Sequence, residues 1–206
     1  MEDVLEVYQL PHDPNFPVVC MDESSKQLVG EVAAPIPMAP GHERIIDHEY
    51  VRNGVAEIFV EVEHLVEKRH VEVTDRRTRK DWAYFIKGML DERYPDEVKV
   101  RLVMDNLNTH DVASLYETFA PAEARRLAGR LEIHHAPKHG SWLNIAEIEL
   151  SALQSQCMNR RIPNRECLQT EISSWELARN TRGAPIHWSF TKENARIKLT
   201  RLCPKL

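Results

Sequence analysis

The amino-acid sequence predicts a single mixed α/β domain. Short apolar runs of strand length alternate with longer segments whose apolar residues recur every three or four positions, as they do on one face of a helix. The 206 residues include 42% hydrophobic and 29% charged side chains, which is typical of folded rather than disordered or fibrous chains. Neither an internal repeat nor a low-complexity linker divides the chain, so its length fits one domain of ordinary size.

The first half of the chain predicts strands and turns. Residues 18–21 form an apolar run that ends at Asp22, which indicates a buried strand. Residues 33–41 hold three prolines and a glycine and predict an irregular loop. Asn53-Gly54 predicts a tight hairpin turn, because both residues tolerate positive φ angles. Apolar and polar residues alternate over 57–62 and again over 70–74, which predicts two half-buried strands paired antiparallel across a short connection.

Helices dominate the second half. Thr78 followed by Asp81 predicts a helix start, apolar residues then recur from Trp82 to Leu90, and Pro95 ends the pattern. The other expected elements are a strand over 100–104 that ends at Asp105, a helical region over 111–130 interrupted at Pro121, a short strand over 131–133, helices over 143–158 and 165–179, and a basic tail over 186–203.

Charge is distributed unevenly along the chain. The net charge of -5 averages -11 over residues 1–67, 0 over residues 68–150 and +6 over residues 151–206. Such asymmetry predicts a polyanionic partner at the C-terminal end; two differently solvated faces are the alternative.

Several classes of protein are excluded by composition. No stretch approaches the ~20 uncharged apolar residues of a membrane span. The first residues are acidic, whereas a signal peptide opens basic and then turns apolar. The four cysteines form no CxxC pair, and the ten histidines form no HExxH motif or zinc-binding spacing. We therefore expect an intracellular protein with reduced, structural cysteines.

Three carboxylates carry the functional interpretation. Asp22 and Asp105 each follow an apolar strand, and the ends of strands in α/β sheets are where ligands gather. Glu147 lies in the first turns of a predicted helix. If the two strands are neighbours and the helix packs across them, the three acids converge. Each has an ordinary alternative: a turn or cap role for the aspartates, and helix capping by Asn144 with Glu147.

A cluster of carboxylates needs a cation at neutral pH, because the charges repel one another. Oxygen ligands without cysteine or histidine favour Mg²⁺ or Mn²⁺ over zinc. The chemistry that uses such a cluster is phosphoryl transfer with two metal ions about 4 Å apart.

The sequences around these acids resemble the three motifs of DDE-type transposases, specifically the bacterial insertion-sequence branch related to the mariner-like elements. The matching segments are VCMDES at 19–24, VMDNLNTH at 103–110 and PKHGSWLNIAE at 137–147. The resemblance implies a ribonuclease H-like mixed sheet flanked by helices, and two divalent ions (Mg²⁺ or Mn²⁺) held by Asp22, Asp105 and Glu147. Gaps of 82 and 41 residues separate the three acids.

The resemblance extends over essentially the whole chain from Pro17. It implies a leader over 1–16, a catalytic core over 17–160 and a basic helical extension of the same domain over 161–206. The second gap is longer than is usual among mariner-like relatives, which indicates a loop inserted before the last helix. The 21 residues before Asp22 leave no room for the family's helix-turn-helix region. We therefore expect a catalytic half, either a fragment or the second of two reading frames, with a separate helix-turn-helix protein or frame as a candidate partner.

Neighbouring residues are candidates for contacts with DNA. They are polar or basic side chains within the motifs or on the late helices: Asn106, His110, Lys138, His139, Arg160, Arg161 and Arg165. Asn106 and His110 are also candidates for orienting Asp105. Glu23 is a candidate accessory ligand, with an exposed turn acid as its ordinary interpretation.

The resemblance implies a transposase catalytic domain that cleaves DNA at insertion-sequence ends and transfers the freed strand. We expect a homodimer on DNA, no membrane association, and a cytoplasmic, nucleoid-associated location. Two rivals remain: a host nuclease of the same fold, and a non-catalytic DNA-binding remnant or inhibitor of transposition.

Overall fold

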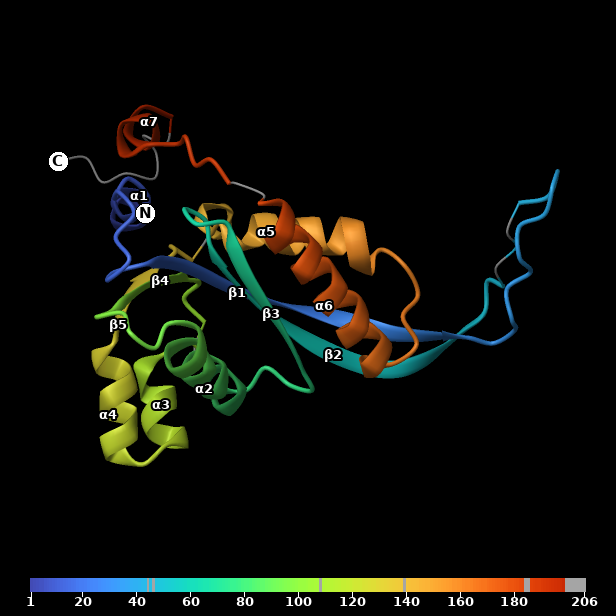
Figure 1. Ribbon diagram of the computed structural model, residues 1–206, viewed down its shortest axis with the longest axis horizontal. Helices are drawn as coiled ribbons and strands as arrows, with labels where there is room; N and C mark the ends of the chain where they lie inside the picture. The colour runs from blue at the N-terminus through green and yellow to red at the C-terminus, as the bar shows by residue number, and fades with distance from the viewer. Residues whose placement is uncertain (44, 46, 108, 139, 184–185, 199–206) are drawn as a thin grey trace.

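One mixed sheet of five strands forms the centre of the molecule (Figure 1). The strand order is β3-β2-β1-β4-β5; β2 runs antiparallel to β1 and β3, whereas β4 runs parallel to β1 and β5. This is the mixed sheet that the sequence predicts. The strands are β1 (Val18–Glu31), β2 (Tyr50–Glu63), β3 (Lys68–Thr74), β4 (Val100–Met104) and β5 (Leu131–His135).

Helices flank the sheet. The computed structural model describes residues 1–43, 45, 47–107, 109–138, 140–183 and 186–198. The helices are α1 (Glu2–Tyr8), α2 (Arg79–Gly88), α3 (Val112–Thr118), α4 (Pro121–Gly129), α5 (Ala146–Leu153), α6 (Arg165–Arg182) and α7 (Lys192–Lys198), with a short 3₁₀ turn over Ser141–Leu143 and π-helical turns over Met89–Arg93 and Gln154–Met158. None of the helices in these ranges is long and apolar enough to cross a membrane.

Alternation along β1 divides the core between the two faces of the sheet. Met21 points to the face covered by α2, where it shares a cluster with Phe59 and Trp82. Asp22 points to the opposite face, because its cross-strand partner Val60 shares a cluster with residues of α5 and α6. The site of Asp22 is therefore on the α5 side.

Most of the predicted elements are confirmed. Thr78 caps α2 in a full capping box with Asp81. The alternating segments form β2 and β3, paired antiparallel. Pro121 opens α4 and so separates it from α3.

Two predictions in the first half are wrong. β1 does not end before Asp22 but continues to Glu31, because β2 pairs with it along nearly its whole length. Asn53-Gly54 is not a hairpin turn: it lies inside β2, opposite Leu28 alone, and the extra residue makes a β-bulge in which Gly54 has φ +96°. β1 and β2 are instead connected through the predicted irregular loop, which projects away from the sheet (Figure 1).

The segments before α5 and at the chain ends also differ from prediction. Regular helix begins at Ala146 rather than at residue 143, and its last part, Gln154–Met158, is π-helical. The leader contains helix α1, whose apolar side chains are buried, and the tail contains α7. At the start of α7 the Thr191 amide donates to Oδ1 of Asn194, and the Asn194 amide donates to Oγ1 of Thr191.

Side chains of α6 complete the outer edge of β3. Asn180 accepts a hydrogen bond from the Arg69 amide and donates one to the Arg69 carbonyl, at 3.0 and 2.9 Å. Glu176 accepts from the Val71 amide, and Arg165 donates to the Val73 carbonyl. An edge strand otherwise leaves these groups unpaired, so α6 fixes its own position by satisfying them.

A buried charge cluster joins α5 to its neighbours. Glu149 is fully buried, and its carboxylate lies 3.0 Å from Nε of Arg69 in β3. Arg179 of α6 donates two hydrogen bonds to the same carboxylate, at 3.0 and 2.8 Å. The rotation of α5 about its axis is thus set by two arginines on the side away from Glu147.

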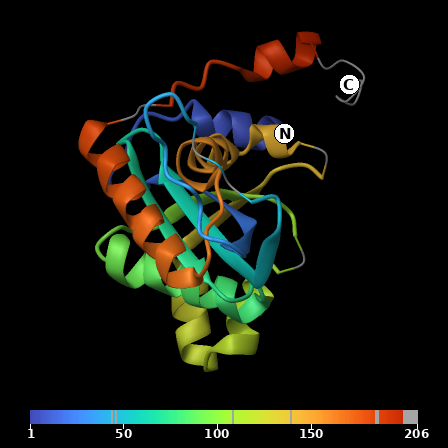
Figure 2. The ribbon, with the colours of Figure 1, turned by 90° about the vertical axis from the view of Figure 1, so that its right-hand side faces the viewer.

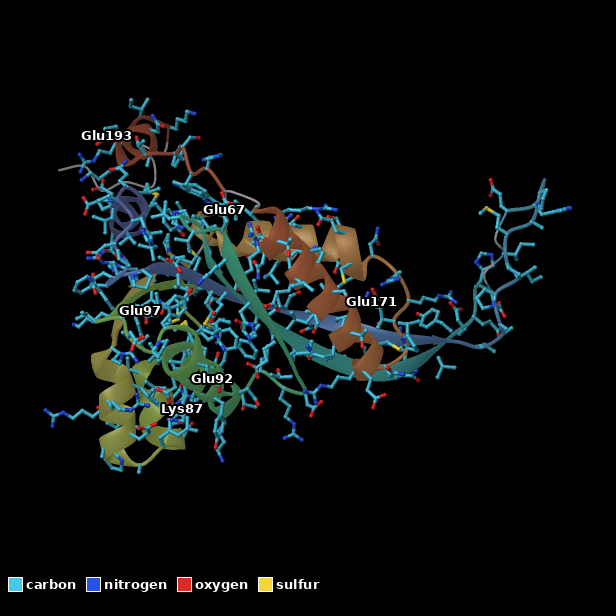
Figure 3. All side chains as sticks on the ribbon, in the orientation of Figure 1. Glu67, Lys87, Glu92, Glu97, Glu171 and Glu193 are labelled. Carbon is cyan, nitrogen blue, oxygen red and sulfur yellow. The ribbon has the colours of Figure 1, made fainter. Side chains whose placement is uncertain are left out.

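We predict that Glu149→Leu lowers the free energy of unfolding by about 3 to 5 kcal/mol, because it leaves buried guanidinium charge uncompensated. Urea denaturation measures the change. Glu171→Ala is the matched control. Glu171 lies on α6 and pairs with Arg160 (Figure 3). Both side chains are exposed, and losing an exposed pair costs about 1 kcal/mol or less. Equal losses in the two variants would contradict the prediction.

His64, in the turn between β2 and β3, makes stability depend on pH. It is 5% exposed, and burial lowers its pKa to about 4. A histidine whose folded pKa is lowered contributes stability above its unfolded pKa near 6.5, and that contribution is lost as the pH falls toward 4. We predict that His64→Phe flattens the fall in unfolding free energy between pH 6.5 and 4 by on the order of 2 kcal/mol. Chemical denaturation across this range tests it; an unchanged slope contradicts it.

Candidate active site

Two aspartates stand side by side on neighbouring strands. β1 and β4 are parallel, with Cys20 opposite Val103. Asp22 and Asp105 each follow two residues later, so they lie at the same level of the sheet. Asp105 comes directly after β4, as predicted, whereas Asp22 lies within β1.

Asp22 is held by the segment that leads into α5. Its carboxylate is buried, with 7% exposure, and accepts hydrogen bonds from the Glu23 amide at 2.9 Å and from Asn144 Nδ2 at 3.1 Å. The same Nδ2 donates to the Met21 carbonyl at 2.8 Å, while Asn144 Oδ1 accepts from the Ala146 amide at 3.2 Å. Asn144 therefore links β1 to the first residue of α5.

This role of Asn144 differs from the alternative considered for it. Asn144 does not form a capping pair with Glu147, because its side chain turns to the strand and the N-cap of α5 is Ile145. Glu147 is exposed in the first turn of α5 and is thus left free of a capping role.

The carboxylates act on one another electrostatically. Burial raises the pKa of Asp22 to about 7; the Glu23 amide opposes this shift, and the charges of Glu147, Glu23 and Asp105 add to it. The structure therefore places Asp105 and Glu147, the other two predicted acids, within electrostatic reach of Asp22. Glu23 is a fourth acid in this group.

His110 bridges two of these acids. Its ring is 2% exposed and stacks on Trp82 with 6.0 Å between ring centres. Nδ1 lies 2.5 Å from Oδ1 of Asp105, and Nε2 lies 3.0 Å from Oε2 of Glu23. Burial lowers the pKa of His110, but the hydrogen bonds to the two carboxylates outweigh it and raise the pKa to about 9. A protonated ring donates to both acids and orients Asp105.

Glu23 is not the exposed turn acid of the ordinary interpretation. It lies within β1, and its side chain is 2% exposed. Ligand atoms of Glu23, Asp105 and His110 all lie within 4.8 Å of one another. Since both ring nitrogens of His110 are engaged by carboxylates, the groups suited to a metal ion are oxygens. Carboxylate oxygens in this number fit a hard divalent cation such as Mg²⁺ or Mn²⁺.

The remaining candidates near the site are exposed or lie outside the described residues. Asn106 is exposed directly after Asp105, and Lys138 is exposed in the loop after β5. His139 lies outside the residues that the structure describes. Both Asn106 and Lys138 are therefore open to a ligand.

The three arginines lie elsewhere and bind groups of this chain. Arg160 pairs with Glu171, and Arg165 donates to Asp75 and to the edge of β3. Arg161 pairs with Glu31, the last residue of β1, and donates to carbonyls at the base of the projecting loop. The fold therefore does not bring these three arginines to Asp22, Asp105 and Glu147.

Sequence reasoning missed two residues of this site. Asn144 was expected to cap a helix, and Tyr8, in the predicted leader, contacts the segment before α5 through its hydroxyl. Asn144 stands inside the third motif, so its position carried a signal. No sequence pattern pointed to Tyr8, because only the fold brings it to the segment before α5.

Comparisons with known proteins agree with this geometry. Residues 17–169 match the family model described as DDE superfamily endonuclease. No curated protein matches in sequence. Among solved structures, the Mos1 transposase paired-end complex with left transposon end has a TM-score of 0.59 at 14% identity, covering 88% of this chain and 56% of that one.

Two further Mos1 structures are similar in the same way. The Mos1 mariner paired-end complex with Mn has a TM-score of 0.57 at 16% identity, covering 87% of this chain and 54% of that one. The Mos1 strand transfer complex has a TM-score of 0.57 at 13% identity, covering 87% and 53%. The chain thus spans just over half the length of these structures and shares their ribonuclease H-like fold. Since the family model covers most of the chain, this protein belongs to the DDE superfamily endonuclease family.

Proposed function

We propose that this protein is the catalytic domain of a transposase, which cleaves DNA at insertion-sequence ends and transfers the freed strand in a reaction that depends on divalent metal. The observation that supports the proposal is that Asp22 and Asp105 lie at the same level on neighbouring strands, with Glu147 near enough for its charge to raise the pKa of Asp22. The structures with the same fold are named as transposase complexes with transposon ends and with a strand transfer product, which supports the choice of reaction.

Asp22, Asp105 and Glu147 are the residues that would hold two Mg²⁺ or Mn²⁺ ions. Bound there, the ions supply activation of water or a 3′-hydroxyl and stabilisation of the leaving oxygen. The protein's own part is positioning. Asn144 holds the Asp22 carboxylate, His110 holds Asp105, and the first turn of α5 presents Glu147.

DNA contacts are proposed for Asn106 and Lys138, which are exposed, and for His139, which lies outside the described residues. Asn106, Lys138 and His139 stand in the second and third motifs, where a phosphate backbone would pass the carboxylates. His110 is buried and serves Asp105 instead. Arg160, Arg161 and Arg165 remain candidates at a second surface, where their charge is shared with acids of this chain.

The domain organisation and assembly are also proposals. We divide the chain into a leader over 1–16, a catalytic core over 17–160 and a basic extension over 161–206. The active form would be a homodimer on DNA, aided by a separate helix-turn-helix protein or reading frame that reads the element end.

Replacing Asp105 by asparagine tests the reaction. We expect Asp105→Asn to reduce Mg²⁺- or Mn²⁺-dependent nicking of inverted-repeat DNA about 100-fold or more, because it removes a charged ligand of the metal ions. Asp96→Asn, an exposed site after α2, is the matched control and should nick at the wild-type rate. Equal nicking by wild type and Asp105→Asn, with contaminating nuclease excluded, overturns the assignment.

The same assay separates the rival functions. Preferential cleavage of RNA–DNA hybrids or junctions would indicate a host nuclease of this fold. DNA binding with a steep salt dependence and no metal-stimulated cleavage would indicate a non-catalytic remnant or inhibitor.

Asp22 provides a prediction about stability. The pKa of this acid is raised in the folded protein, so its carboxylate costs stability above the unfolded pKa, and the full cost applies above about pH 7. We expect Asp22→Asn to stabilise the metal-free protein at pH 8 by on the order of 2 kcal/mol and to lose this advantage toward pH 4.

Thermal melts with and without metal measure this effect. Mg²⁺ or Mn²⁺ should raise the melting temperature of wild type and leave that of Asp22→Asn unchanged, since a ligand stabilises only the state that binds it. A less stable Asp22→Asn at pH 8 would contradict the prediction.

A further inference from the structure

Two segments outside the family match lie together beside the segment that enters α5. These are helix α1 and residues 186–198, which include α7; they pack side by side at one end of the molecule (Figure 2). Arg196 makes two hydrogen bonds of 2.8 Å to Glu2, and Lys192 pairs with Glu6. The two ends of the described chain thus form one unit.

Tyr8, at the end of α1, reaches from this unit to the backbone before α5. Its side chain is buried, and its hydroxyl donates to the Leu143 carbonyl at 2.8 Å. The same oxygen accepts from the Ile145 amide at 3.3 Å and lies 3.4 Å from Sγ of Cys20 in β1. The hydroxyl therefore bonds the residues on both sides of Asn144 and contacts the strand that carries Asp22.

Apart from the bonds of Asn144 to β1 and to the Ala146 amide, local side chains contribute little to holding the entry to α5. Ile145 is the N-cap residue, and its apolar side chain makes no capping hydrogen bond. The 3₁₀ turn over Ser141–Leu143 likewise lacks a side-chain cap. Within the segment, Asn144 Oδ1 accepts from the Ala146 amide; Tyr8 adds bonds from outside, to the Leu143 carbonyl and from the Ile145 amide. Glu147 stands two residues after Ile145.

Aromatic rings of the tail support the same segment. Trp188 packs on Tyr8 with 5.1 Å between ring centres, and its Nε1 donates to the Phe190 carbonyl. Phe190 meets Trp142 edge-on at 5.5 Å. The entry to α5 is thus contacted by Tyr8 at 143 and 145 and by Phe190 at 142.

We propose that Tyr8 is a positioning residue for the metal-binding carboxylates: its hydroxyl fixes residues 143–145, so that Asn144 reaches Asp22 and Glu147 faces the same edge of the sheet. The proposal rests on the proposed function. It assigns a role in the active site to the N-terminal segment that sequence reasoning set aside as a leader.

Binding of Mn²⁺ to the full chain, followed by the electron paramagnetic resonance of the free ion, tests the proposal without recourse to activity. We expect Tyr8→Phe, which keeps the ring and removes the hydroxyl, to weaken Mn²⁺ binding roughly tenfold, as loss of an outer support of metal ligands does. Tyr84→Phe is the matched control; this tyrosine is 60% exposed on α2, and its loss should leave binding unchanged. Phe190→Leu should weaken binding in the same direction, since it loosens the other contact.

The outcomes are distinguishable. Equal Mn²⁺ affinity in wild type, Tyr8→Phe and Phe190→Leu, with wild-type binding abolished by Asp105→Asn, overturns the positioning role and leaves the proposed function intact. No Mn²⁺ binding to wild type overturns the proposed function itself. Far-ultraviolet circular dichroism and urea midpoints show whether each variant is folded; a folded Phe190→Leu carries the test if Tyr8→Phe does not fold.

Discussion

Two hydrogen bonds from the Asn144 amide, to the Met21 carbonyl and to the Asp22 carboxylate, join helix α5 to the sheet. These bonds connect residues more than 120 positions apart in sequence, so the site forms only when the chain folds. β1 and β4 fix the two aspartates through parallel pairing, whereas Glu147 comes from a helix, whose position depends on side-chain contacts with the sheet. Asn144 ties that helix to the strand, while Glu149 and its two arginines set its rotation from the opposite side.

Positive charge is distributed unequally among the acids. His110 donates to Asp105 and Glu23, so their charges are partly neutralised by the protein. The described contacts of Asp22 include an amide of the backbone and one of a side chain, both uncharged. The folded protein therefore concentrates unbalanced negative charge on the α5 side of the sheet. A cation from solution would relieve repulsion there and would therefore stabilise the folded protein.

The sequence patterns predicted correctly those helices and strands whose formation depends mainly on neighbouring residues. The capping box at Thr78, the alternation of β2 and β3 and the proline at the start of α4 follow from neighbouring residues alone. Asp22 was placed at a strand end because polar residues follow it, but pairing with β2 extends β1 through them. Asn144 has the sequence pattern of a cap, and only a distant partner decides otherwise. The motifs thus located the three acids, whereas their supports depend on contacts far apart in sequence.

The cover that α6 provides for β3 limits how this protein meets other chains. Arg69, Val71 and Val73 have backbone groups on the outer side of β3 that bond to Asn180, Glu176 and Arg165. A foreign strand seeking to extend the sheet by β-augmentation would have to displace these side chains first. The β3 edge is therefore closed to strand addition, and a partner that binds there must dock through side-chain surfaces instead.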